Sequence, residues 1–110
     1  MDAEERFVAL VERLSSRPGV TLPGAPGGHG FGRDALKVAG AIFVMPWRGG
    51  LAFKLPRQRV AALLADGTGV PFDAGKGRPM REWVAIPDGA AVDDAVLAEE
   101  ALEFVSSVKR

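Results

Sequence analysis

Three cations and a tryptophan near residue 80 form the strongest candidate binding site in the sequence. A glycine-rich loop contains Lys76 and Arg78. Arg81 follows this loop, and Trp83 comes two residues after Arg81. Glycine leaves backbone amides free to point at an anion, and arginine can hold a phosphate or carboxylate through two parallel hydrogen bonds. The pattern therefore predicts a site for an anion or a partner at these four residues. The alternative is a solvated hairpin whose charges pair with an acidic last helix.

Strand alternation determines what Trp83 can contact. If Met80, Val84 and Ile86 face the core, then Arg81 and Trp83 lie on the opposite face of the sheet. Cations interleaved with aromatic rings on such a face can stack single-stranded nucleic acid, and an apolar face also suits a protein partner. The third interpretation is that Trp83 belongs to the buried core, because aromatic residues dominate cores.

The chain shows no pattern typical of catalysis. Residues 27–34 resemble a phosphate-binding loop, but Arg33 and Asp34 stand where such a loop needs Lys and then Ser or Thr. His29 is the only histidine and cysteine is absent, so the sequence offers no metal-ligand set and no thiol nucleophile. The serines all lie at expected helix ends: Ser15, Ser16, Ser106 and Ser107. We therefore expect a protein that is not an enzyme, with no catalytic residue, no metal and no cofactor.

Length and charge indicate one domain over residues 1–110 with a polarised charge distribution. The net charge of the chain is zero, but residues 33–81 carry nine Lys or Arg against three Asp, and residues 82–110 carry two against seven acids. These regions either neutralise each other in the fold or leave a basic patch that meets an acidic partner. The absence of cysteine, of a signal segment and of a long apolar run predicts a cytoplasmic protein without a membrane segment.

The pattern of apolar residues predicts a single α+β domain. Helices are expected over residues 2–17, from Pro56 at the first helical position, and from Asp93 and Asp94 onward, where the two carboxylates suit a helix start and a solvated face. Residues 18–30 form a glycine-rich loop. Five strands fill the remaining segments, which gives a five-stranded antiparallel sheet with helices in the order α-β-β-β-α-β-β-α.

Two tight turns set the expected register of the first three strands. An Ala39-Gly40 turn pairs Val38 with Ala41 and Leu36 with Phe43. For the second turn, a three-residue loop over residues 48–50 is preferred to a two-residue loop over residues 49–50, because it keeps one apolar face intact. That face then holds Leu36, Val38, Phe43, Met45, Leu51, Phe53 and Leu55. The opposite face holds Lys37, Ile42, Val44, Ala52 and Lys54.

Several segments resemble a known family. They are Phe31-Gly32, Leu36-Lys37-Val38, Ile42-Phe43, Leu51-Ala52-Phe53-Lys54-Leu55, Phe72-Asp73 and Met80-Arg81-Glu82-Trp83-Val84. Together they resemble the TfoX/Sxy N-terminal domain family, and more distantly the YjbR-type proteins, over roughly residues 30–105. The resemblance implies an antiparallel sheet with helices in the class of type III secretion-chaperone-like folds. The family supplies no catalytic residues to transfer.

These observations predict a small cytoplasmic binding domain. The favoured role is protein–protein interaction, as a regulatory adaptor, with a second copy of the chain as one candidate partner. The alternative is nucleic-acid binding through the basic region of residues 33–81. Because only part of the central cations can share one sheet face, nucleic acid is the less favoured partner.

Overall fold

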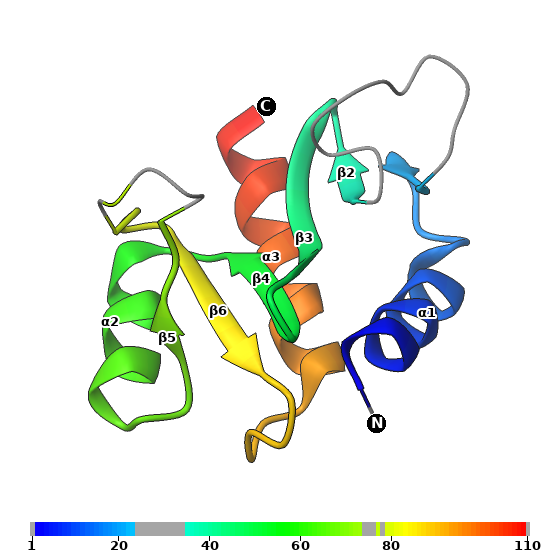
Figure 1. Ribbon diagram of the computed structural model, residues 1–110. Coiled ribbons are helices and arrows are strands. Elements are labelled where there is room, and N and C mark those ends of the chain that lie inside the picture. The colour runs from blue at the N-terminus through cyan, green and yellow to red at the C-terminus, as the bar shows by residue number, and fades with distance from the viewer. Residues whose placement is uncertain (1, 24–34, 74–76, 78, 110) are drawn as a thin grey trace.

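The structure is a computed structural model that describes residues 2–23, 35–73, 77 and 79–109. It is an α+β fold with one antiparallel sheet and three helices, as the sequence predicts (Figure 1). The helices are α1 (Ala3–Leu14), α2 (Arg57–Ala65) and α3 (Asp94–Lys109). The strands are β1 (Val20–Thr21), β2 (Leu36–Val38), β3 (Ala41–Trp47), β4 (Gly50–Lys54), β5 (Val70–Pro71) and β6 (Trp83–Pro87). No helix among the described residues is long and apolar enough to cross a membrane.

The sheet has six strands in the order β1-β2-β3-β4-β6-β5, so the expectation of five was wrong. The additional strand, β1, lies in a segment that the sequence predicts to be loop. It is only two residues long, and Val20 pairs with Val38 of β2. Such a short strand has no periodicity of its own, and it forms because β2 offers a free edge.

Helix α1 begins where local chemistry predicts. The Asp2 carboxylate accepts a hydrogen bond of 2.9 Å from the Glu5 amide, and the Glu5 side chain accepts one of 3.3 Å from the Asp2 amide. This capping box satisfies amides that have no partner inside the helix. The same helix buries Phe7, Leu10 and Leu14 against the sheet.

The β3–β4 turn differs from both registers considered above. It is a two-residue turn at Arg48 and Gly49, with φ values of 41° and 76°. Val44 therefore pairs with Phe53, and Met45 with Ala52. Both residues of a type I′ hairpin turn need positive φ, and this twist matches that of the strands.

Gly50 belongs to β4, and this position needs a glycine because β6 passes very close to it. A Cβ atom at Gly50 would lie 2.4 Å from the carbonyl oxygen of Ile86. A glycine that reads as a turn residue in the sequence is therefore a strand residue that permits close approach of two strands.

A β-bulge in β3 changes which residues face the core. The first turn is the predicted one, since Val38 pairs with Ala41, but Leu36 pairs with Val44 and not with Phe43. Phe43 is thus an extra residue on β3, and both Phe43 and Val44 are fully buried in the main core. A bulge shifts the alternation of side chains by one residue. Val44 therefore faces the main core and Met45 the opposite face of the sheet, the reverse of the expected arrangement.

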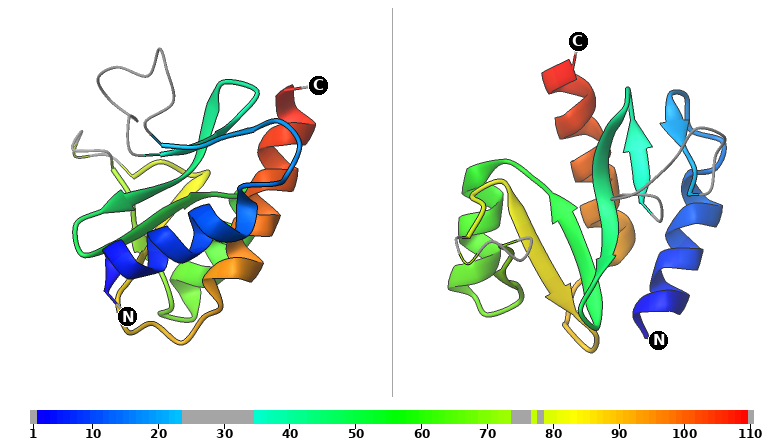
Figure 2. Two further views of the ribbon diagram at one scale, coloured as in Figure 1. Left: turned by 90° about the vertical axis from the view of Figure 1, so that its right-hand side faces the viewer. Right: turned by 45° about the horizontal axis from the view of Figure 1, so that its top comes forward.

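The main core unites one face of the sheet with all three helices. Figure 1 shows α2 beside β5 and β6 and α1 toward the opposite edge of the sheet, and Figure 2 shows α1 next to α3. The other sheet face, here called the second face, carries a smaller buried cluster: Ala35, Met45, Ala52, Phe72, Trp83 and Ala85. Met80 packs against this cluster, so its expected place on the main core face was wrong.

Candidate functional site

The structure places two of the four predicted site residues. Lys76 and Arg78 lie outside the described residues, so their part in an anion site stays a prediction. Arg81 is exposed just before β6 and forms no ion pair with another described residue. Trp83 is buried, with 8% of its surface exposed, and belongs to the buried cluster on the second face. Arg81 and Trp83 therefore do not form an open stacking surface together.

Trp83 is one end of a row of three aromatic rings on the second face. The ring centroids of Trp83 and Phe72 lie 5.3 Å apart, and those of Phe72 and Trp47 lie 4.7 Å apart. The second pair has an interplanar angle of 66°, an edge-to-face geometry that aromatic pairs favour. Phe72 in the middle is fully buried, whereas Trp47 is half-buried. Only the Trp47 end of the row is therefore accessible.

A cation lies at each end of the aromatic row. The Arg48 guanidinium lies 4.8 Å from the Trp47 ring centroid, and the Lys54 ammonium lies 5.8 Å from the Trp83 ring centroid. Lys54 also lies 3.9 Å from a carboxylate oxygen of Glu82. Arg48 forms no ion pair with another described residue and is exposed. The Trp47–Arg48 end is therefore the part of the row that is available to a partner.

A pocket of about 170 Å³ lies beside Trp47 at the end of the β3–β4 hairpin. Its lining is mixed polar and apolar and comes from four strands and one turn: Trp47, Arg48, Gly50, Val70, Pro71, Ala85 and Pro87. Val70, on the edge strand β5, is 43% exposed. The sequence reasoning missed this pocket because it depends on the true register of the β3–β4 hairpin.

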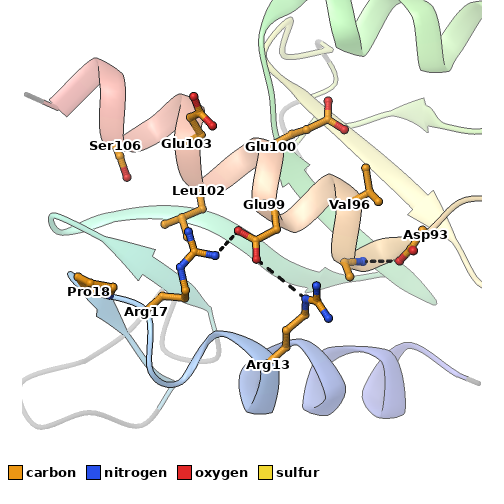
Figure 3. Close-up of a pocket in the computed structure, with 11 residues that line it drawn as sticks. Arg13, Arg17, Pro18, Asp93, Val96, Glu99, Glu100, Leu102, Glu103 and Ser106 are labelled. Atoms are coloured by element: carbon orange, nitrogen blue, oxygen red, sulfur yellow. Dashed lines mark hydrogen bonds and ion pairs between the residues drawn. The ribbon is translucent and has the colours of Figure 1, made fainter.

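A larger groove of about 620 Å³ lies between the end of α1 and the outer face of α3 (Figure 3). Glu99 of α3 points between two arginines and pairs with Arg17, while Arg13 lies 4.0 Å away. Glu100 points away from α1 and binds Arg59 of α2 through bonds of 2.9 and 3.3 Å. Ion pairs thus connect α3 to both other helices, and these contacts account for most of the charge around the groove.

A buried arginine joins α1 to the start of α3, and sequence reasoning missed it. Arg6 donates two hydrogen bonds of 2.7 Å to Asp94, one of 2.7 Å to Asp88 and one of 3.1 Å to the carbonyl of Ile86. The hydrogen bond to Asp94 raises the pKa of Arg6, and burial opposes this effect. Asp94 was expected to face solvent at a helix start. Both carboxylates do lie at the start of α3, since Asp94 is in its first turn and Asp93 accepts a bond of 2.9 Å from the Ala95 amide.

Helical spacing does contain a signal for this network. Arg6 lies four residues before Leu10 and next to Phe7, so it falls on the buried face of α1. A charge in that position needs a buried partner of opposite sign.

Among the described residues, no group of three or more His, Cys, Asp or Glu is arranged to hold a metal ion. Comparison of the chain with protein-family models, with curated proteins and with solved structures finds no match. The resemblance to the TfoX/Sxy N-terminal domain family therefore stays a prediction.

Proposed function

We propose that this protein is a non-catalytic binding domain that docks a protein partner through the surface at the end of the β3–β4 hairpin. This hairpin-end surface consists of Trp47, Arg48, Val70, Pro71 and Pro87. The observation that carries the proposal is the accessible Trp47–Arg48 pair beside a preformed pocket. Tryptophan and arginine are enriched among residues that dominate the binding energy of protein interfaces.

The geometry favours a protein over a nucleic acid. Stacking of bases requires exposed ring faces, and Trp83 is buried beneath its neighbours. Two central cations are also engaged, since Lys54 lies close to Glu82 and Arg59 binds Glu100. Nucleic-acid binding is therefore the second candidate, supported by the cations at the two ends of the aromatic row.

The proposal is tested by capture of partners with matched charge-reversal variants. Purified wild-type protein, Arg48→Glu and Arg57→Glu are each immobilised and exposed to a lysate of the source cells, and bound proteins are quantified by mass spectrometry. Arg57 is a suitable control because it is exposed on α2 and forms no ion pair with another described residue. We expect a protein that binds wild type and Arg57→Glu and loses at least about tenfold in recovery with Arg48→Glu, as truncation of a central contact would cause.

Two results would contradict the proposal. If Arg48→Glu recovers the same proteins at the same level as wild type, the hairpin end is not the docking surface. If recovery depends on nucleic acid, so that nuclease treatment of the lysate abolishes it, the second candidate replaces the first.

A further inference from the structure

We propose that the pocket beside Trp47 receives one apolar side chain from an extended segment of the partner, and that Arg48 binds an acidic residue next to it in that segment. The inference rests on the proposed function and specifies the chemistry of the partner. It follows from the size of the pocket, its lining and the charge at its rim.

The pocket exists because small residues lie side by side on the second face. Gly50 of β4 pairs with Pro87 of β6, and Ala52 pairs with Ala85. The strand order β3-β4-β6-β5 places Gly50 and Ala85 between Trp47 and Val70, and these four residues line the pocket, so the sheet surface is hollow between two larger side chains. The hollow is set by backbone pairing and needs no rearrangement before binding, which lowers the entropic cost of association.

Its volume selects a single side chain as the occupant. Sites for cofactors and comparable small molecules are typically about 300–1,000 Å³, whereas this pocket is about 170 Å³. Five of its seven lining residues are aromatic, aliphatic or proline, namely Trp47, Val70, Pro71, Ala85 and Pro87. A branched aliphatic side chain therefore fits the volume and can contact these five residues, while the polar part of the lining lies toward Arg48 and the backbone.

Arg48 determines the charge of the neighbouring residue in the partner. Its guanidinium carbon lies 4.8 Å from the Trp47 ring centroid, and Arg48 lines the pocket, so the contact with the ring places the positive charge beside the pocket. No described carboxylate pairs with it. A carboxylate can accept two parallel hydrogen bonds from a guanidinium group, so an Asp or Glu beside the apolar residue is the complementary group.

The adjacent sheet edge argues for recognition by side chains. Strand β5 is two residues long, and Pro71 has no amide donor. A partner therefore cannot extend the sheet by a continuous ladder along β5. Insertion of a side chain into the pocket remains the way to gain affinity at this place.

The test uses three synthetic peptides of eight residues in titrations of ¹⁵N-labelled full-length protein followed by NMR. The reference peptide has Leu followed by Asp in a Gly/Ser background, the second replaces Leu by Ser, and the third replaces Asp by Lys. We expect the reference peptide to shift the Trp47 indole and the amides of Val70 and Ala85. The dissociation constant of the Ser peptide should be at least about tenfold higher than that of the reference peptide, because one lost apolar contact in a pocket has this effect. The Lys peptide should bind more weakly still at low salt, because Arg48 repels it.

Three variants connect the effects to the proposed groups. Ala85→Val partly fills the pocket and should reduce binding of the reference peptide, and Arg48→Gln should remove the preference for Asp over Lys. An unchanged thermal midpoint shows that Ala85→Val is folded, and Val70→Ser serves as a second pocket variant that lies on the surface. Equal binding of the Leu and Ser peptides, or of the Asp and Lys peptides, would overturn the inference.

Failure of this inference is distinguishable from failure of the proposed function. A captured partner that is lost with Arg48→Glu but still binds Ala85→Val and Val70→Ser keeps the hairpin-end surface and removes the pocket. A partner that is indifferent to Arg48→Glu removes both.

Discussion

Replacement of Arg6 by methionine tests the buried network between α1 and α3. The substitution keeps an unbranched side chain of similar length but removes four hydrogen bonds to Asp94, Asp88 and Ile86. Removing one partner of a buried ion pair costs about 3–5 kcal/mol, because the remaining charge is left without compensation. Here the side chains of Asp88 and Asp94 are 33% and 21% exposed, so water can replace part of the lost interaction. We therefore expect a loss at the low end of that range, about 3 kcal/mol.

Urea unfolding followed by circular dichroism measures this loss. At about 4 °C per kcal/mol for a domain of this size, the thermal midpoint should fall by about 12 °C. The control is Arg13→Met, which removes a cation that is 58% exposed and only 4.0 Å from Glu99. An exposed pair of this kind contributes less than about 1 kcal/mol.

A double-mutant cycle separates the pair from the individual side chains. Asp94→Asn alone should also destabilise, but combined with Arg6→Met it should add much less than its separate cost, with a coupling of about 1–2 kcal/mol. The reasoning is wrong if Arg6→Met costs no more than Arg13→Met, or if the two changes at Arg6 and Asp94 are additive. Because the Arg6 pKa is raised, its contribution is fully present at and below neutral pH and is lost only in strong alkali.

Three further predictions concern turns and close approaches. Ala39 has a φ of 51°, so Ala39→Asn should raise stability by about 0.5–1 kcal/mol in thermal unfolding, because Asn tolerates this conformation better; a loss would contradict the turn assignment. Gly50→Ala should cost about 2–3 kcal/mol in urea unfolding, since the new Cβ would lie 2.4 Å from the Ile86 carbonyl oxygen; a neutral result would refute the close packing of β4 and β6. Asp66 accepts a bond from the Thr68 amide, and hydrogen bonds from Thr68 lower its pKa. NMR titration should therefore find the Asp66 pKa below its ordinary value and closer to it in Thr68→Val, and the stability it contributes should be lost as the pH falls through the folded pKa.

Local patterns in the sequence determined the fold class and most of the elements. The capping box of Asp2 and Glu5 begins α1 within one residue of the predicted start, and Pro56, expected as the first residue of its helix, is the N-cap of α2. The Ala39-Gly40 turn follows the predicted pairing of Val38 with Ala41. Each of these features depends on residues within a few positions of one another, so a single stretch of sequence contains the whole cause.

The candidate site depended on interactions between distant segments. The sequence left open whether Trp83 shares an open sheet face with Arg81 or belongs to the core, and in the structure Trp83 is buried in one cluster with Phe72. The sequence shows a tryptophan and an arginine before a glycine pair at residues 47–50, yet nothing local shows that Trp47 and Arg48 lie beside a pocket. That pocket needs β5 and β6 to lie next to the hairpin end.

Tertiary structure alone decided the phase of the central strands. Two-residue alternation in β3 is compatible with either face, and a bulge at Phe43 changes the phase only because β2 pairs on both sides of it. The same holds for the second turn, where β6 pairs along β4 and makes Gly50 a strand residue. Alternation within one strand indicates that one of its two faces is buried. Which face is buried depends on the strands and helices that pack against it, and these are distant in sequence.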